Sequence, residues 1–441
     1  MKNNYDIIVV GAGIAGISAS VKAARQGASV LLVERYGFVG GMSTAGMVSP
    51  FMKHSINDEV LVKGIYEELE KKMRLNNGMI DNGFYANSFR SAAFNLLFQS
   101  KVELALNTEV ISVSKNINNI ESLTLMTPHG KQNIKAKYFI DTSGDAQLLY
   151  LGKYPFEKGD DETGYLQALT LFFRLGGVDL RKATDFVKEN KKDFFAWMEY
   201  DFDLTKIISV AGYFSVVKEA IKNGELHPSV EYIFYTTLPD SGEASFNTTN
   251  ILDLDATSSE DLTKAEFIGR TQVQQVVKLL QNKIPGFENS YLLETAVQVG
   301  VRETRRAIGE YSISGNDIKN GEKFEDAIAR GCYGIDIHGQ KDEKSRMEDL
   351  PEGQYYEIPL RSLIVKDAEN LLVAGRCISS TREGQSAVRI MPTCSATGEA
   401  CGALAGIANK KDITIRDVDY NELEKELVGN LSKKGNNDVR I

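Results

Sequence analysis

YDIIVVGAGIAGISAS, at residues 5–20, places a short run of apolar and β-branched residues directly before three glycines with the spacing G-x-G-x-x-G. The run predicts a β-strand, and the segment rich in Ala and Ser that continues to Gln26 predicts a helix. Gly27 ends this helix, and residues 28–33 form a second apolar run that predicts another strand. The first 34 residues therefore predict one β-α-β unit.

The glycines of this unit have the spacing that a dinucleotide requires. Gly11 allows the tight turn, Gly13 lets backbone N–H groups approach a pyrophosphate, and Gly16 lets the helix pack closely on the strand. Glu34, eighteen residues beyond Gly16, is placed to accept hydrogen bonds from ribose hydroxyls. A glycine-rich turn without a ligand is the alternative, which the correct placement of strand, helix and acid disfavours. The unit does not by itself distinguish FAD from NAD.

Length and charge exclude several classes of protein. A chain of 441 residues predicts two or three domains, and a formal net charge of −9 argues against a nucleic-acid partner. No segment offers eighteen uninterrupted apolar residues, so we expect no membrane insertion. The first residues lack the apolar core of a signal peptide, and a cytoplasmic location is therefore the default expectation.

The possible metal ligands are scattered along the chain. Four cysteines and four histidines occur without C-x-x-C or H-E-x-x-H spacing, so we expect neither a bound metal, an iron–sulfur cluster nor disulfides. They are Cys332, Cys377, Cys394, Cys401, His54, His129, His227 and His338.

Further strands and one long helix are predicted to complete the nucleotide-binding domain. Residues 102–139 contain short β-rich stretches separated by turn residues, which predicts a small antiparallel meander. Residues 371–374 predict a buried strand. A helix over about 391–408 opens with a proline in its first turn, and Gly398, Gly402 and Gly406 recur along it. We expect this stripe to pack closely against another backbone, with ligand contact as the less favoured alternative.

The chain is therefore predicted to be an α/β protein, in which a Rossmann-like FAD-binding domain contains an inserted α+β substrate domain. Residues 341–352 are highly charged and predict a loop that returns the chain to the first domain. The predicted parts are the first portion of the FAD-binding domain at 1–150, the insertion at 151–353, the returning portion at 354–412 and a C-terminal tail at 413–441.

Several blocks of sequence resemble the FAD-dependent oxidoreductases of the glutathione-reductase superfamily. The likeness is strongest to a bacterial group related to fumarate reductases and to the flavin domain of heterodisulfide reductases. The blocks are DIIVVGAGIAGISAS at 6–20, LLVERYGFVGGMST at 31–44, AKYFIDTSGDA at 136–146, VGVRETRRAIGEY at 299–311, YGIDIH at 333–338, and NLLVAGRCISS with MPTCSATGEACG between 370 and 402.

The resemblance implies roles for residues far beyond the first glycines. Gly40 and Gly41 match a double glycine that passes close to the pyrophosphate, and Val110 matches a position whose backbone meets adenine. Asp145 matches an acid near the pyrophosphate, with helix capping as its alternative role. The residues implied to bind FAD are Gly11, Gly13, Ile14, Ala15, Gly16, Glu34, Arg35, Gly40, Gly41, Met42, Ser43, Thr44, Val110, Ser143, Gly144, Asp145, Gly375, Arg376, Pro392, Thr393 and Cys394.

Two of these arginines have alternative roles. Arg35 is also consistent with a solvated surface charge, and Arg376 with a structural ion pair. The segment 389–394 matches the part of the family that places a helix N-terminus near the flavin pyrimidine ring, where its dipole stabilises a reduced anionic flavin.

The departures from the superfamily narrow the prediction. A second G-x-G-x-x-G and a redox C-x-x-x-x-C pair are both missing, which disfavours a disulfide reductase with its own NAD(P)H domain. No histidine lies beside the double glycine, where fumarate reductases can attach FAD, so we expect noncovalent FAD.

Three residues are the candidate catalytic groups. His338 can exchange a proton near flavin N5, and Asp336 lies on the same side two residues earlier if the segment is extended. Arg302 and Arg389 can hold an anionic or polarised oxygen, and Tyr333 is a weaker candidate proton donor. A structural histidine and structural ion pairs in the cluster Arg302, Arg305 and Arg306 remain the alternatives.

The sequence thus predicts an FAD-dependent oxidoreductase that transfers a hydride between flavin N5 and a small organic substrate with a C–OH or activated C–C bond. The alternative is a flavin protein that passes electrons to a partner redox protein. A flavin-dependent RNA-modifying protein is disfavoured by the net charge of −9. The electron acceptor or donor is not predicted, and a homo-oligomer stays open.

Overall fold

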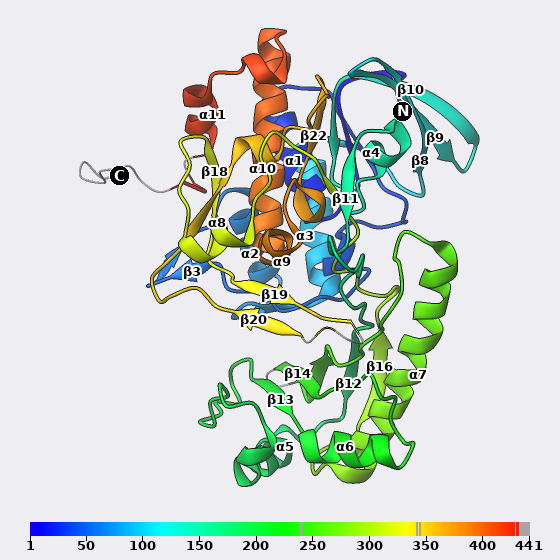
Figure 1. Cartoon of the computed structure of the whole chain (residues 1–441), viewed down its shortest axis with the longest axis vertical. Helices are drawn as coiled ribbons and strands as arrows, with labels where there is room; N and C mark the ends of the chain where they lie inside the picture. The colour runs from blue at the N-terminus through cyan, green and yellow to red at the C-terminus, as the bar shows by residue number, and fades with distance from the viewer. Residues whose placement is uncertain (239–240, 341–342, 344, 428, 432–441) are drawn as a thin grey trace.

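The computed structural model describes residues 1–238, 241–340, 343, 345–427 and 429–431. Figure 1 shows two parts, an upper one that contains both the N-terminal strands and the C-terminal helices, and a lower one built from the middle of the chain. The α-helices are α1 (Ile14–Arg25), α2 (Ile65–Leu75), α3 (Ala86–Gln99), α4 (Gln147–Gly152), α5 (Leu180–Glu189), α6 (Phe214–Lys222), α7 (Ser259–Lys283), α8 (Gly315–Asn320), α9 (Arg382–Val388), α10 (Met391–Lys411) and α11 (Tyr420–Glu426).

A seven-stranded sheet organises the upper part of the molecule. Its strands are β1 (Asn4–Val10), β2 (Val30–Val33), β7 (Glu103–Ala105), β8 (Glu109–Asn116), β9 (Asn119–Thr127), β10 (Gly130–Asp141) and β22 (Leu371–Val373). Strands β7, β2, β1, β10 and β22 run parallel in that order. The first half of β10 instead continues an antiparallel meander with β9 and β8. The predicted β-α-β unit and meander are therefore confirmed.

Helices α1 and α10 pack against each other through the predicted glycine stripe. A Cβ atom at Gly398 would lie 2.1 Å from the carbonyl oxygen of Ala15, and one at Gly402 would lie 2.3 Å from that of Ala19. Such distances leave room only for glycine, so the two backbones touch directly. The packing role predicted for the stripe is confirmed.

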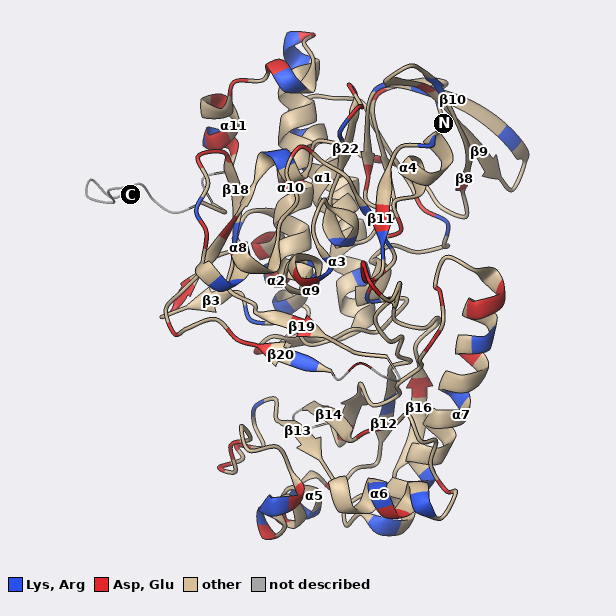
Figure 2. Ribbon diagram, in the orientation of Figure 1, with Lys and Arg blue, Asp and Glu red and all other residues tan. Residues whose placement is uncertain are grey.

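A five-stranded antiparallel sheet forms the lower part of the molecule. Its order is β13 (Ser209–Gly212), β14 (Ile233–Leu238), β15 (Glu243–Phe246), β12 (Phe173–Gly176) and β16 (Tyr291–Thr295). Helices α5, α6 and α7 lie on the outer side of this sheet, and Figure 2 shows that both signs of charge alternate along them. This mixed, solvated face is typical of amphipathic helices that cover a sheet.

Short two-stranded ribbons complete the fold. They are β3 (Ser55–Ile56) with β4 (Glu59–Val60), β5 (Met79–Ile80) with β6 (Gly83–Phe84), β11 (Phe156–Lys158) with β17 (Arg305–Ala307), β18 (Ala327–Gly331) with β21 (Tyr356–Pro359), and β19 (Ile335–Ile337) with β20 (Arg346–Glu348). Strand β20 lies inside 341–352, where the sequence predicts a loop. The prediction of a loop is therefore wrong for this part. High charge does not exclude a strand at the surface, because a two-stranded ribbon can keep its charged side chains in water.

The hydrophobic residues form separate cores for the two sheets. The core of the five-stranded sheet draws its residues from 169–299, together with Met47. Ile313, Ile328 and Ile337 fall inside 151–353 but pack in the core around α1 and α10. The domain boundaries stay a prediction. In the part of the chain that the structure describes, no helix combines the length and apolar character needed to cross a membrane.

Candidate active site

The glycine segments 11–16 and 40–41 meet each other and Thr142 at one place. Thr142 donates from Oγ1 to the carbonyl oxygen of Gly11 over 2.7 Å, and Gly40 donates its N–H to that of Ala12 over 2.7 Å. A Cβ atom at Gly16 would lie 1.8 Å from the Gly11 oxygen, and one at Gly41 would lie 2.9 Å from the Cα of Gly13. The backbone therefore forms a cradle that side chains would fill.

Two helix N-termini converge beside this cradle. Helix α1 starts after Gly13 and α10 after Ile390, and neither terminus has a side-chain capping bond. Gly375 lies between them, since a Cβ atom there would be 3.0 Å from the Cβ of Ala15 and 3.9 Å from the Sγ of Cys394. Uncapped N-termini present free N–H groups, which is the arrangement that binds phosphates and other anions.

Glu34 lies at the rim of the cradle. Its carboxylate accepts from the N–H of Ala12 over 2.7 Å and from that of Tyr36 over 2.9 Å. Burial raises the pKa of Glu34, and the two backbone N–H groups oppose that rise. A carboxylate has about four acceptor sites. Two of them therefore remain for hydroxyl groups, as the predicted ribose contact requires.

Asp145 and Arg376 form an ion pair next to the cradle. The Nη2 atom of Arg376 lies 2.6 Å from Oδ1 of Asp145, and its Nε donates to the carbonyl oxygen of Gly144 over 2.9 Å. The structural alternative for Arg376 is thus present in the structure. Arg35 is half-exposed and lies 3.9 Å from the other oxygen of Asp145. This position agrees with the solvated alternative for Arg35.

The other predicted cofactor residues line the same region. Ser43 donates to the sulfur of Met391 over 2.9 Å, which ties the double-glycine segment to the start of α10. Thr108 donates its N–H to the carbonyl oxygen of Glu34 over 3.0 Å, and Val110 follows two residues later in β8. The structure also brings Met42, Thr44, Ser143, Pro392 and Thr393 into these segments.

His338, Arg389 and Tyr333 gather around one carboxylate. The Nε2 atom of His338 lies 3.4 Å from Oδ1 of Asp336, at the end of β19. The Tyr333 hydroxyl donates to Oδ2 of Asp336 over 2.9 Å, and Nη2 of Arg389 lies 3.3 Å from the same oxygen. The extended spacing thus places Asp336 beside the imidazole, as the sequence predicts.

Arg302 adds a second cation to this group. Its side chain is buried and donates from Nη1 to the carbonyl oxygen of Ala168 over 2.6 Å, its only hydrogen bond to the described residues. Burial, together with the charge of Arg389, lowers the pKa of Arg302 to about 10. The Nε atom of Arg389 is itself buried without a partner in the described chain. The site therefore holds unsatisfied donors and excess positive charge.

The titratable groups of this site influence each other strongly. Burial, followed by the charge of Arg302, lowers the pKa of His338 below its usual value, while Asp336 partly opposes the shift. Burial alone would raise the pKa of Asp336, but His338 and Arg389 hold it below its usual value. Burial and Asp336 raise the pKa of Tyr333. At neutral pH the imidazole is therefore neutral and Asp336 is ionised.

A model of the FAD dependent oxidoreductase family matches residues 6–427 of this chain. The chain belongs to that family. FAD is accordingly its cofactor, and oxidation–reduction is its class of reaction. The backbone cradle, the uncapped N-termini and the rim carboxylate described above fit a dinucleotide of this kind.

Curated relatives match only in part. The chain is 42% identical to digeranylgeranylglycerophospholipid reductase of Picrophilus torridus over 82 residues, which are 16% of this chain and 21% of that protein. It is 40% identical to vinyl phenol reductase of Lactiplantibacillus plantarum over 70 residues, 15% of this chain and 14% of that protein. Among solved structures, a geranylgeranyl bacteriochlorophyll reductase-like protein of Thermoplasma acidophilum aligns with a TM-score of 0.50 at 11% identity. That alignment covers 96% of this chain and 82% of that one, and it shows the shared fold.

Hydrogen bonds connect the cofactor side of the oxidoreductase to its candidate catalytic residues. Arg376, which holds Gly144, also donates to the carbonyl oxygen of Val301, the neighbour of Arg302.

Gln385 donates to the carbonyl oxygen of Arg302 over 2.9 Å and accepts from Gln167 over 3.2 Å. The N–H of His338 in turn points to Gln167 over 3.4 Å. Neither glutamine was predicted from the sequence, because an isolated Gln belongs to no motif.

The arginine cluster of the oxidoreductase divides into two roles. Arg306 is buried and pairs with the buried carboxylate of Glu303, which also lies 3.2 Å from Arg382. Arg305 lies over the ring of Tyr150 at 4.1 Å. The structural ion pair is thus present for Arg306, whereas Arg305 makes a cation–π contact instead. Arg302 makes no ion pair within the described residues, and it lies outside the helices and strands, before β17.

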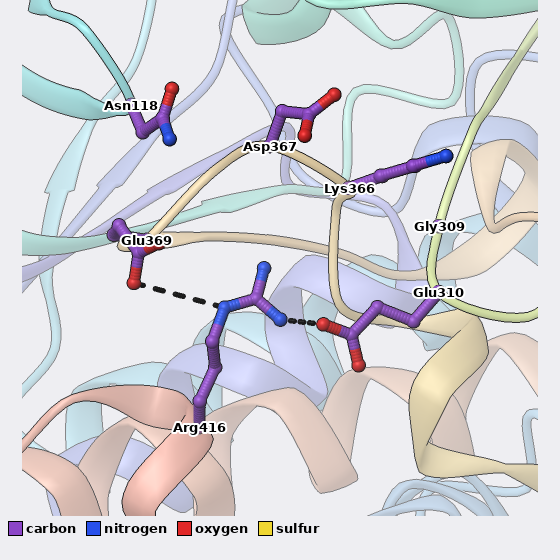
Figure 3. A pocket seen from close by; sticks show the side chains of 7 residues that line it. All are labelled: Asn118, Gly309, Glu310, Lys366, Asp367, Glu369 and Arg416. Carbon is purple, nitrogen blue, oxygen red and sulfur yellow. Dashed lines mark ion pairs between the residues drawn. The ribbon is translucent and has the colours of Figure 1, made fainter.

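A separate cavity of about 420 Å³ lies beside the loop that precedes β22. Figure 3 shows Arg416 within it, between the carboxylates of Glu310 and Glu369. Arg416 also donates to the carbonyl oxygens of Val365 and Ala368. This arginine holds the chain after α10 against the loop before β22. None of the candidate FAD-binding or catalytic residues lines the cavity.

Proposed function

We propose that this protein is an FAD-dependent oxidoreductase that transfers a hydride between flavin N5 and a small organic substrate with a C–OH or activated C–C bond. The observation that supports it is the group of buried Arg302 and partly buried His338, Asp336 and Arg389, which is joined by hydrogen bonds to the predicted cofactor segments. The FAD is proposed to be bound noncovalently. Within the family, the grouping nearest fumarate reductases and the flavin domain of heterodisulfide reductases is also part of this proposal.

FAD, when bound, supplies the acceptance or donation of a hydride at N5. His338 handles the accompanying proton. Asp336 holds Nε2 of the ring, which leaves Nδ1 to take the proton from a substrate hydroxyl during oxidation and to return it during reduction. Because its pKa is lowered, His338 is neutral at neutral pH and so acts as a base without prior deprotonation.

Arg302 and Arg389 handle the charge on the substrate. With His338 neutral, two guanidinium groups face the single carboxylate of Asp336, and the excess is one positive charge. An anionic or polarised oxygen would neutralise that charge and would satisfy the unpartnered donors. A preorganised donor of this kind typically contributes about 10²–10³ in turnover.

The experiment is an anaerobic absorption spectrum of the purified protein, followed by titration with hydroxy acids, polyols and unsaturated acids. We expect denaturation to release FAD and one class of compound to bleach or restore the flavin bands. Arg302→Gln should slow the response to that compound by about 10²–10³ while FAD content is unchanged. Arg361→Gln, which removes a surface ion pair with Asp326 and a contact with the ring of Tyr311, is the matched control. Bands that respond to a partner redox protein but to no metabolite would overturn this proposal in favour of electron transfer.

A further inference from the structure

A segment rich in aromatic residues stands apart from every feature used above. FFAWMEYDF at 194–202 holds five aromatic side chains in nine residues and includes the only tryptophan of the chain, Trp197. It lies between α5 and β13, outside the regular elements. Buried Phe194 belongs to the core of the five-stranded sheet, but Trp197 is 60% exposed. An exposed tryptophan that lies among other aromatic rings is typical of a binding surface.

Phe195 of this segment lies at the centre of an aromatic group. Its ring contacts Tyr232 edge-to-face at 5.0 Å, Phe214 edge-to-face at 4.9 Å and Trp197 in a stacked arrangement at 6.0 Å. Such contacts fix the rings relative to each other. The four side chains therefore form a firm apolar surface, which we call the aromatic subsite (Phe195, Trp197, Phe214 and Tyr232).

Tyr232 connects the aromatic subsite to the candidate catalytic residues. It directly precedes β14, and two residues later the carbonyl oxygen of Phe234 accepts the N–H of Asn247. The Asn247 side chain accepts from Thr170, whose backbone pairs with Gly300, two residues before Arg302. These contacts thus join the segment that carries Tyr232 to the segment that carries Arg302.

The pKa shifts of Tyr232 and Arg302 show that each side chain influences the other. Burial raises the pKa of Tyr232, and the charge of Arg302 acts in the opposite direction. Tyr232 and Asp336 in turn help to hold the pKa of Arg302 up against burial. No described residue accepts a hydrogen bond from the Tyr232 hydroxyl or donates one to it. That hydroxyl and the donors of Arg302 other than Nη1 therefore remain available to a ligand.

Resting on the proposed function, we propose that the substrate is an aromatic carboxylate, whose ring packs on Phe195 and Tyr232 and whose carboxylate is bound by Arg302 and Arg389. The aromatic subsite supplies a flat apolar contact, and the two guanidinium groups supply the charge and the hydrogen-bond donors that a carboxylate requires. Neither half of the site alone would select such a molecule, because a ring without a charge leaves Arg302 unpaired.

The fluorescence of Trp197 allows ligand binding to be measured without turnover. As the only tryptophan it reports directly on the aromatic subsite through its fluorescence. The FAD-loaded protein is titrated with 3-phenylpropanoate, with 3-cyclohexylpropanoate and with 3-phenylpropanamide, excited at a wavelength where these probes do not absorb. We expect saturable quenching or shift by 3-phenylpropanoate, and about tenfold weaker binding of the other two probes, since each lacks either the flat ring or the charge.

Variants assign the two halves of the binding site. Tyr232→Leu should weaken 3-phenylpropanoate about tenfold and leave 3-cyclohexylpropanoate unchanged, whereas Arg302→Gln should weaken both acids alike. Phe202→Leu, from the same segment but in contact with Tyr200 rather than with Phe195, is the matched control. If Tyr232→Leu fails to fold by circular dichroism, Tyr232→Phe and Phe195→Leu replace it, with the ring preference retained in the first and lost in the second.

The outcomes separate this inference from the proposed function. Equal binding of the phenyl and cyclohexyl acids, or a Tyr232→Leu variant that keeps the ring preference, overturns the aromatic subsite. The proposed function survives that result if some other acid still bleaches or restores the flavin bands through Arg302. Binding of all three probes unaffected by Arg302→Gln overturns both.

Discussion

The cofactor cradle and the catalytic group differ in the atoms that form them. The cradle is made of backbone, and its narrow places are glycines where a Cβ atom would lie within 3 Å of another chain segment. The catalytic group is made of side chains, which come from segments near residues 302, 336 and 389. Backbone geometry follows from local sequence, whereas the meeting of distant side chains depends on the whole fold.

This difference has a physical consequence for substitution. A glycine in the cradle resists change because nearby backbone cannot move aside. A side chain of the catalytic group can be replaced at nearly constant volume, so that chemistry is lost while the fold remains. The substitutions below test that division, in decreasing order of expected effect.

Gly16→Val should break the cradle and the fold together. Its Cβ atom would lie 1.8 Å from the carbonyl oxygen of Gly11, and we expect a loss of at least about 3 kcal/mol of stability. Circular dichroism and the FAD absorbance of the purified protein measure the effect. The control is Arg25→Val, on the exposed side of the same helix, which should stay folded and keep its FAD absorbance. A folded Gly16→Val protein with full FAD content would contradict the backbone account.

His338→Asn should break only the chemistry. We expect turnover to fall by roughly 10²–10⁴ with unchanged FAD content and melting temperature, because the proton is no longer exchanged. Steady-state kinetics with the substrate found by flavin titration measure the change. His129→Asn, at an exposed turn, is the control. Full turnover in His338→Asn would return that histidine to a structural role.

Gly13→Ala should separate cofactor binding from folding. Gly13 has φ −68°, and its added Cβ atom would meet nothing closer than the Cα of Gly41 at 4.0 Å. The protein should therefore fold normally, while the methyl group occupies the space in front of helix α1. We expect about tenfold weaker FAD binding, measured by titrating the FAD-free protein and following flavin fluorescence. Unchanged affinity would place the pyrophosphate elsewhere.

Two substitutions should move the pH dependence of substrate oxidation in opposite directions. The acidic limb of kcat/KM reports deprotonation of His338, whose lowered pKa places the limb below 6.5. Arg302→Gln removes a positive neighbour, so that pKa rises and the limb moves to higher pH. Asp336→Asn removes a negative neighbour, so that pKa falls and the limb moves to lower pH. Shifts in the same direction would contradict the arrangement of charges.

Local patterns predicted the parts of the fold that local physics controls. The G-x-G-x-x-G turn, the meander after residue 102 and the four-residue spacing of Gly398 and Gly402 each carry their structural cause within a few residues. The loop predicted over 341–352 is wrong at β20, because this strand forms by pairing with β19 and the composition of the segment does not record that pairing.

The sequence by itself determined the dinucleotide-binding unit, the family resemblance and the identity of His338, Arg302 and Arg389 as candidates. Only the tertiary structure decided that Arg302 stands apart from its neighbours Arg305 and Arg306, and that Ala168 and Gln385 hydrogen-bond to it. The reason is distance along the chain: contacts between residues separated by many tens of positions are fixed by how the two sheets pack. No short pattern records that packing.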